Sequence, residues 1–199
     1  MPVKTEGGYL GDWLVEEFGA PNYCRSEVNV LAPVNIDSGS VVGLATTLTS
    51  YRVPYDNVGG ANTGKSAAAT GVLISSIVAD PSMSCSIVDL ADVGTGTTTE
   101  NHLLAVGDII EVLGGNDAEL NVYATIVSVP TTKTFTIATS SVTDATYVVA
   151  IRKLNQAAVM LSKGPAVVAN LDWGTSDSTG LSAGKAELLA LNIVVKEAV

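Results

Sequence analysis

Short apolar segments separated by turn-forming residues run along almost the whole chain, and this pattern constrains the fold more than any other feature. The segments are rich in Val and Thr, which favour strands, while Gly, Ser, Asn and Asp stand between them. Strands do not alternate regularly with long helical segments, so a parallel sheet of βαβ units is not expected. The 199 residues suffice for one large domain or two small ones. We therefore predict a mainly β protein.

The predicted elements fall into three groups along the chain. The first group has strands at 26–34, 41–48, 51–55 and 71–79, with a Gly- and Ala-rich loop over 56–69. The second is a small module of five or six strands within 84–152, including 108–113, 122–129, 134–138 and 147–152. The third has strands at 157–161, 166–169 and 193–196, and a short helix from its N-cap Ser182 to Leu191.

Residues 1–22 show little periodicity, and we interpret them as an extended N-terminal arm. The arm carries several large apolar side chains, namely Tyr9, Leu10, Trp13, Leu14, Val15 and Phe18. Such side chains on an arm indicate that it docks on a surface. That surface is either another protein or the arm's own domain, and both alternatives stay open.

The charge of the chain limits its partners. There are 20 acidic and 10 basic residues, which gives a formal net charge of -10. This charge repels phosphate backbones and anionic lipids, so neither nucleic acid nor a membrane surface is an expected partner. No apolar stretch has the length of a transmembrane helix, and polar residues 1–8 predict no signal peptide. Cys24 and Cys85 lack metal-ligand spacing, and two free thiols in a reducing compartment are favoured over a disulfide.

Groups suited to acid–base catalysis are scarce, because His102 is the only histidine. It lies shortly before a Gly-Asp turn, where a hydrogen-bonded turn histidine is favoured over a metal ligand. Asp89 and Asp92 flank a short segment that lacks the calcium-loop pattern. We expect no enzymatic activity, no metal and no cofactor.

The stretch from Gly59 to Ser66 matches the phosphate-binding pattern G-x-x-x-x-G-K-[ST]. In a functional loop of this kind, backbone amides and Lys65 would hold phosphates and Ser66 would bind magnesium. A helix should then follow, but Gly71 arrives five residues later and begins a strand-like run. We interpret Gly59, Gly64, Lys65 and Ser66 as a chance match in a Gly-rich surface loop. A nucleotide-binding enzyme that depends on Lys65 is the competing hypothesis.

Gly180 to Gly184 match the nucleophile-elbow pattern G-x-S-x-G around Ser182. An elbow follows a strand and precedes its histidine in the chain. Here a polar loop precedes Ser182, and His102 lies upstream. We therefore interpret Ser182 as a helix N-cap.

A series of segments follows in a distinctive order and spacing: Gly11–Glu16, Asn22–Val28, Ile36–Gly43, Tyr51–Tyr55, Ala69–Leu73, Gly164–Val168 and Leu191–Lys196. In this order the chain resembles the lambda-type phage head decoration proteins over about residues 1–80 and 154–199. Family members usually join these two stretches by a short link, whereas residues 81–153 intervene here. The intervening stretch resembles small β modules of phage structural proteins that have a His-Leu-x-x-Gly-Asp-like turn, here His102–Asp108.

The resemblance implies a β-clip-like core domain formed by 23–80 and 154–199, with a short C-terminal helix and an inserted antiparallel β module at 81–153. It implies a non-enzymatic protein, assembled in the host cytoplasm, that cements the expanded head from outside. Homotrimers would bind the major capsid protein at three-fold sites. The arm would order on the capsid by adding a strand to the coat protein. The arm residues that the resemblance assigns to capsid binding are Tyr9, Leu10, Asp12, Trp13, Leu14 and Val15.

An alternative is that the inserted module carries the function and binds host glycans or other ligands at the virion surface. Exposed aromatic side chains would favour this alternative. The module offers only Tyr123, Phe135 and Tyr147, of which Phe135 is expected in the core.

Overall fold

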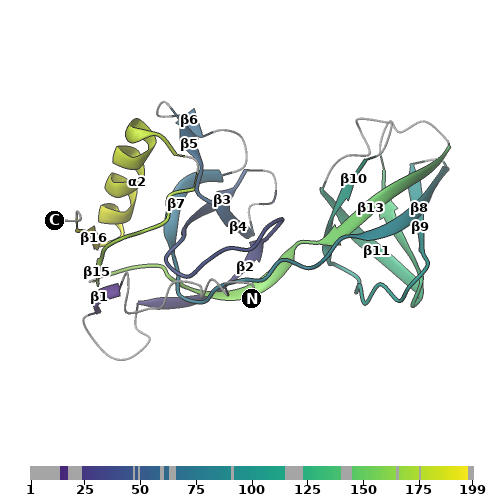
Figure 1. Cartoon of the computed structure of the whole chain (residues 1–199), viewed down its shortest axis with the longest axis horizontal. Coiled ribbons are helices and arrows are strands. Elements are labelled where there is room, and N and C mark those ends of the chain that lie inside the picture. Colours follow the sequence, from purple (N-terminus) through teal and green to yellow (C-terminus); the bar gives the residue numbers. More distant parts are fainter. Residues whose placement is uncertain are drawn as a thin grey trace, which may run out of the picture. The chain divides into compact units, whose positions relative to one another are not determined.

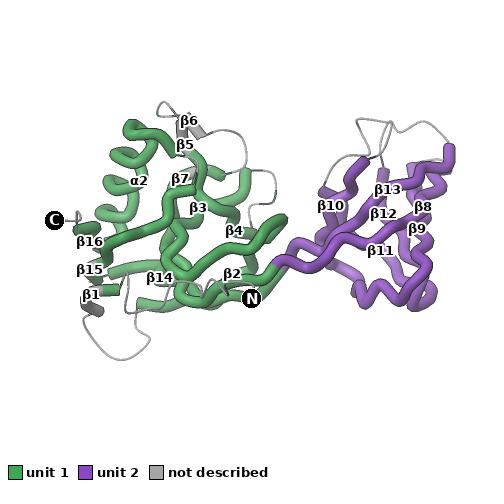
Figure 2. Tube along the Cα trace, viewed as in Figure 1, with its two compact units in different colours: residues 1–78, 156–199 green, residues 79–155 purple. Residues whose placement is uncertain are grey.

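The structure, a computed structural model, describes residues 14–17, 24–46, 48, 50–58, 61–62, 66–90, 92–114, 123–139, 145–164, 166–174 and 176–196. It is mainly β, as predicted, with two small closed barrels and a short helix near the C-terminus. The chain divides into two compact units (Figure 2). Unit 1 comprises Met1–Val78 and Gln156–Val199, and unit 2 comprises Ala79–Asn155.

Unit 1 contains a closed five-stranded barrel with the strand order β14-β2-β4-β3-β7. Its strands are β2 (Arg25–Leu31), β3 (Val41–Ala45), β4 (Tyr51–Pro54), β7 (Ser66–Leu73) and β14 (Asn155–Leu161). Strands β2 and β4 pair in parallel, whereas β3 pairs antiparallel with β4 and β7. Strand β14 also pairs antiparallel with β7. Because β14 follows unit 2 in the sequence, this barrel closes only when distant parts of the chain meet.

A small sheet and the helix complete unit 1 (Figure 1). The sheet has the order β1-β15-β16, and its strands are β1 (Leu14–Glu17), β15 (Ala166–Val168) and β16 (Ile193–Val195). Strands β5 (Asn57–Val58) and β6 (Ala61–Asn62) form a short antiparallel pair. Helix α2 (Ser178–Ala190) packs against β16, β7 and β5. One buried apolar cluster includes barrel, sheet and helix residues, among them Val41, Val72, Val168 and Leu188.

Helix α2 begins earlier than predicted. Asp177 is its N-cap, and the Asp177 carboxylate accepts a hydrogen bond from the Gly180 N–H at 2.8 Å. Ser182 lies inside the helix, where its hydroxyl donates to the Ser178 carbonyl at 3.0 Å. The prediction that Ser182 is the N-cap is therefore wrong. Asp177 already satisfies a free amide of the first turn, so the helix starts there.

Gly184 lets α2 lie close to two aromatic rings. A Cβ at this position would lie 2.5 Å from Cζ3 of Trp173 and 3.0 Å from Cε1 of Tyr55. The two rings meet edge to face with centroids 6.1 Å apart. The Glu187 carboxylate also ties the helix to the barrel, because it accepts a hydrogen bond from the Ala69 N–H at 2.7 Å. The glycine that weakens helix propensity thus permits close packing.

The strand near residue 70 differs from the predicted one. We expected a loop over 56–69 and a strand over 71–79, whereas β7 spans Ser66–Leu73. The small residues of β7 have low strand propensity, but pairing with β3 supplies their backbone hydrogen bonds. Beyond Leu73 the chain bends, and Ile77 forms an isolated bridge with Ile36. Pairing between distant strands, rather than local propensity, sets both ends of β7.

Unit 2 is a closed six-stranded barrel with the order β10-β11-β12-β9-β8-β13, which confirms the predicted five or six strands. The strands are β8 (Met83–Leu90), β9 (Val93–Thr98), β10 (Ile109–Leu113), β11 (Tyr123–Thr131), β12 (Thr134–Ala138) and β13 (Thr146–Lys153). All six neighbouring pairs are antiparallel. Alternate side chains fill the interior, including Ile87, Ile110, Ile126, Phe135 and Ile151.

Two of the three inward positions of β9, Gly94 and Gly96, are glycines because large residues of β12 face them. A Cβ at Gly96 would lie 2.2 Å from Cζ of Phe135, and one at Gly94 would lie 2.9 Å from Cγ1 of Ile137. The Phe135 side chain is fully buried, which confirms its expected place in the core. The alternating glycines of β9 therefore mark a narrow barrel rather than a turn.

Candidate functional site

The described part of the predicted capsid-binding arm is a strand of unit 1. Strand β1 pairs antiparallel with β15, and Leu14 lies opposite Val168. The Leu14 side chain is half-buried and packs against the apolar cluster of unit 1. Only the strand backbone is described for Val15. Outside the described residues lie Tyr9, Leu10, Asp12 and Trp13. Among the described strands, β1 has a partner on one side only.

The two catalytic motif matches lie in surroundings that differ from those of the motifs. Gly59, Gly64 and Lys65 lie outside the described residues. Ser66 is fully buried and starts strand β7, where a phosphate-binding loop would continue into a helix. Its hydroxyl accepts a hydrogen bond from the Asp56 N–H at 3.0 Å. Ser182 lies within α2 rather than on a strand-to-helix elbow.

His102 is a hydrogen-bonded turn histidine, as predicted. Its side chain is only 4% exposed, and its Nδ1 accepts a hydrogen bond from the Leu104 N–H at 3.0 Å. Its ring meets the Phe135 ring edge to face at a centroid distance of 5.5 Å. Among the described residues, no hydrogen-bond partner reaches its Nε2 atom. The turn from 102 to 108 is thus anchored on the barrel core through His102.

Asp108 anchors the other end of the same turn. Its carboxylate accepts hydrogen bonds from the Ala105 N–H at 2.8 Å and the Asn155 amide at 3.2 Å, and it pairs with the Lys153 ammonium at 2.8 Å. Burial alone would raise the pKa of Asp108, but the Lys153, Ala105 and Asn155 interactions hold that pKa below its ordinary value. The sequence analysis did not predict this network. The only sequence feature that pointed to it was the Gly107-Asp108 turn after His102.

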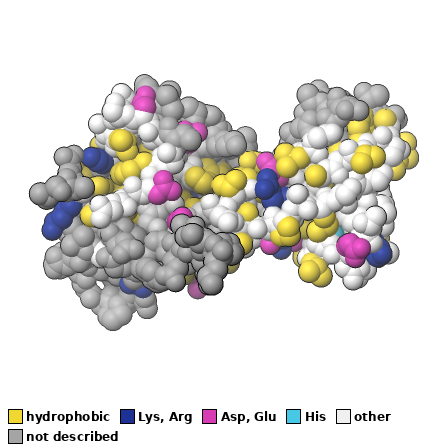
Figure 3. Space-filling view, in the orientation of Figure 1, with side chains coloured by type: hydrophobic (Ala, Val, Ile, Leu, Met, Phe, Trp, Pro, Cys, Tyr) yellow, Lys and Arg dark blue, Asp and Glu magenta, His cyan; other side chains and the backbone are white. Residues whose placement is uncertain are grey.

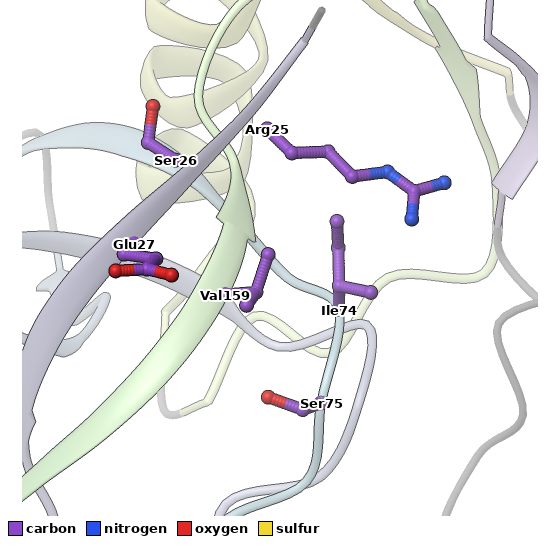
Figure 4. Close-up of a pocket in the computed structure, with 6 residues that line it drawn as sticks. All are labelled: Arg25, Ser26, Glu27, Ile74, Ser75 and Val159. Atoms are coloured by element: carbon purple, nitrogen blue, oxygen red, sulfur yellow. The ribbon is translucent and has the colours of Figure 1, made fainter. Parts of the chain in front are cut away.

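A surface cavity of about 480 Å³ lies in unit 1, where β2, β14 and the segment after β7 meet (Figure 4). Its charged lining residues are Arg25 and Glu27, which have opposite signs. The Ser26 hydroxyl is 2.7 Å from the Ser162 hydroxyl, so it already has a partner. Ile74 and Val159 supply apolar walls. This lining offers mixed polar contacts, without a nucleophile hydrogen-bonded to a histidine or carboxylate base.

On the face that Figure 3 shows, the described residues carry few clustered charges. Figure 3 shows charged side chains scattered among white and yellow atoms on the visible face. Within the described part of the chain, no three or more His, Cys, Asp or Glu side chains are placed to hold a metal ion. The same residues include no helix that is long and apolar enough to cross a membrane. Tyr123 and Tyr147 of unit 2 are both half-buried.

Cys24 and Cys85 are both buried and neither is in a disulfide, and one lies in each unit. Burial raises the pKa of the Cys85 thiol to about 11. A thiol in this state is a weak nucleophile at neutral pH.

Comparisons with known proteins give no further assignment. The chain matches no protein-family model, no curated protein and no solved structure.

Proposed function

We propose that this chain is a non-enzymatic phage head decoration protein that binds the outside of the expanded capsid. Homotrimers would sit at three-fold sites of the major capsid protein and hold neighbouring capsomers together against internal DNA pressure. The role is mechanical and requires neither cofactor nor catalysis. Many modest contacts around a closed shell add up to a stable assembly.

One observation carries this proposal. The stretches that resemble decoration proteins, about 1–80 and 154–199, nearly coincide with unit 1, which comprises Met1–Val78 and Gln156–Val199. The stretch outside the resemblance forms its own closed barrel. We infer that unit 1 is the β-clip-like decoration core and that unit 2 is the inserted antiparallel module.

The local structure at the junction supports an insertion. The Gln156 side-chain amide donates a hydrogen bond to the Val78 carbonyl at 3.3 Å. The two points at which the chain leaves unit 1 and returns to it therefore lie side by side. A module can be inserted between adjacent ends at small cost, because the cost of loop closure grows slowly with loop length. Unit 1 therefore needs only a short link in place of unit 2.

The N-terminal strand supports the proposed contact with the coat protein. Pairing of β1 with β15 attaches the arm to unit 1 just after Tyr9, Leu10, Asp12 and Trp13. Among the described strands β1 lies at the edge of its sheet, and such a strand can pair with a coat-protein strand through main-chain hydrogen bonds. Residues ahead of it would supply apolar anchors.

Co-sedimentation with phage shells tests the proposal. Purified chain is mixed with expanded, undecorated shells of the source phage and, in parallel, with unexpanded shells. We expect saturable pelleting with expanded shells only, at about one copy per coat subunit. Absence of pelleting by the folded wild-type chain with expanded shells would contradict the proposal.

Two variants sharpen this experiment. A chain that lacks residues 1–13 keeps β1 and should remain folded, but it should no longer pellet with shells. The Lys65→Ala chain serves as the matched control and should pellet like the wild type. Loss of a measurable nucleotide affinity in Lys65→Ala would instead favour the nucleotide-binding hypothesis.

A further inference from the structure

The first half of the turn from 102 to 108 is held by one nitrogen of a histidine ring. The Nδ1 atom of His102 accepts a hydrogen bond from the Leu104 N–H at 3.0 Å. The backbone N–H of His102 donates to the Thr132 carbonyl, also at 3.0 Å. Because Nδ1 is an acceptor, the neutral ring carries its proton on Nε2. A protonated ring donates from both nitrogens, so the bond between Leu104 and Nδ1 exists only while the ring is neutral.

The described surroundings of the ring hold no anion that pairs with it. His102 is 4% exposed, and its ring lies against Phe135 in the core of the barrel. Among the described residues, no hydrogen-bond partner reaches Nε2, and no carboxylate forms an ion pair with the ring. A buried charge without a partner is costly. Protonation of the ring in place would therefore break one hydrogen bond and bury an unpaired charge.

Charged groups near the ring come from several segments of unit 2. They are Asp80 ahead of β8, Lys153 on β13, Lys133 between β11 and β12, and Glu100 and Asp108 on the segment that carries the histidine. Strands β11 and β12 contribute none. The Lys153 ammonium pairs with the Asp108 carboxylate at 2.8 Å, and the Lys133 ammonium donates to the Thr99 carbonyl at 2.7 Å. None of these groups can restore the acceptor that Nδ1 loses when it binds a proton.

The residue between His102 and Leu104 is held in a strained conformation. Leu103 has a φ angle of +52°, in the left-handed region that bulky residues rarely adopt. Backbone strain of this kind persists only while surrounding contacts impose it. The Leu103 side chain is 88% exposed, so it loses almost no burial if the turn opens. Loss of the Nδ1 hydrogen bond would therefore let Leu103 relax.

We propose that His102 is an acid-sensitive switch, which holds residues 102–105 closed while its ring is neutral and releases them when the ring binds a proton. In the open turn the imidazolium and the Leu104 N–H are both hydrated. The open turn binds one more proton than the closed turn, so a falling pH favours opening. The switch belongs to unit 2 alone and does not depend on the proposed role in capsid decoration.

The second half of the turn should stay in place when the switch opens. The Gly107 N–H donates to the Ile126 carbonyl at 2.9 Å, and the Ile126 N–H donates to the Asp108 carbonyl at 2.8 Å. Although burial opposes it, the Lys153 ammonium and the hydrogen bonds of the carboxylate hold the pKa of Asp108 below its ordinary 3.8. Between about pH 6 and pH 4 the turn is therefore released at its histidine end and held at its aspartate end.

Hydrogen exchange of the full chain at pH 7.5 and pH 5.0 tests the switch. The readout is the protection factor of the Leu104 amide, which is corrected for the intrinsic pH dependence of exchange. An exposed imidazole has a pKa of about 6.5, so a proton that binds only the open turn should lower this protection by up to about 30-fold. Amides of β12 should keep their protection, because the barrel stays closed.

His102→Asn is the main variant. The Asn side-chain oxygen is as many bonds from Cα as Nδ1 is, so it can accept the Leu104 N–H, but it does not titrate. The variant loses packing against Phe135 and should be less stable at every pH. Its Leu104 protection factor should nevertheless be the same at pH 7.5 and pH 5.0. The matched control is Asp108→Asn, which changes the other end of the turn and should keep the pH dependence of the wild type in this range.

The nitrogen chemical shifts of the ring give a readout on the wild-type chain that needs no variant. They should show the Nε2–H form at pH 7.5 and the imidazolium as Leu104 loses its protection. Equal Leu104 protection at both pH values in the wild type, or an undiminished pH dependence in His102→Asn, would overturn the proposal. A ring that gains its proton while the Leu104 amide stays protected would do the same. Equal loss of protection in β12 would also overturn it, because the whole barrel would then be opening.

Discussion

The barrels of the two units are both closed, but they recruit their strands differently. Unit 2 takes all six strands from one continuous stretch and pairs them antiparallel. Unit 1 includes a parallel pair, β2 with β4, and obtains β14 from beyond unit 2. Contacts between distant segments slow folding, because the chain loses entropy before such contacts can stabilise it. We therefore expect unit 2 to fold as an independent element and unit 1 to depend on both ends of the chain.

The hydrophobic cores of the two units also differ in how many parts of the chain contribute to them. The interior of unit 2 forms one apolar cluster made only of its own residues. The described residues of unit 1 form two buried clusters, and one of them includes residues of the sheet β1-β15-β16 and of α2. The barrel of unit 2 is therefore self-sufficient, whereas the barrel of unit 1 needs further elements to cover it.

The largest expected effect comes from truncating each core separately. Phe135→Ala should destabilise unit 2 by about 3–5 kcal/mol, and Leu73→Ala should destabilise unit 1 by about 2–5 kcal/mol, because both side chains are fully buried. Hydrogen exchange should show lost protection in the mutated unit and retained protection in the other. Loss of protection in both units from either change would show that they unfold together.

A smaller effect should follow from Gly96→Ala in unit 2. The new Cβ would overlap the Phe135 ring, and overpacking of this kind costs about 1–3 kcal/mol. Chemical denaturation of the variant measures the loss. Adding Phe135→Leu should recover part of the stability lost in Gly96→Ala, as measured against Phe135→Leu alone. If the second change recovers nothing, the glycine has a role other than making room for the ring.

The attachment of α2 to the barrel distinguishes unit 1 from unit 2 and can be tested through Glu187. Glu187→Ala removes the acceptor for the Ala69 N–H and should cost about 1 kcal/mol in unit 1. Glu187→Gln keeps an acceptor oxygen and should recover most of this loss. Exchange of the Ala69 amide gives the local readout, and unchanged exchange in Glu187→Ala would contradict the role of this contact.

The smallest effect concerns the acid stability of unit 2. The pKa of Asp108 is lowered in the folded state, so its contribution is present above its ordinary value of 3.8 and is lost as the pH falls toward the lowered value. Asp108→Asn should therefore flatten the stability of unit 2 below about pH 4. Urea denaturation across pH 2–6 measures the slope, and an unchanged acid limb in the variant would contradict the assignment.

The sequence predicted the features that depend on local patterns. The strands at 134–138 and 147–152, the turn role of His102 and the buried position of Phe135 were all accessible from alternation and turn residues. The start of β7 was not accessible, because its small residues become a strand only through pairing with β3. Strand β9 was missed for a related reason, since its inward glycines lack the apolar alternation of a half-buried strand.

Among the candidate functional residues, too, local sequence predicted some features and only the folded structure revealed others. That Ser66 does not belong to a phosphate-binding loop could be inferred from the sequence, because Gly71 follows where a helix should continue. The exposure of Leu103 could not be inferred, because it depends on the burial of both neighbours against the barrel. The Asp108 network was also hidden, since Lys153 and Asn155 reach it only after β13 has paired with β10.

The two buried thiols give each barrel its own chemical reporter. Cys24 belongs to unit 1 and Cys85 to unit 2, and both are shielded in the folded state. Because burial raises the pKa of Cys85, this thiol should resist alkylation until its barrel opens. The rates at which the two cysteines are labelled would therefore record the opening of each barrel within one intact chain. The same measurement could follow the protein free in solution and on any surface that it binds.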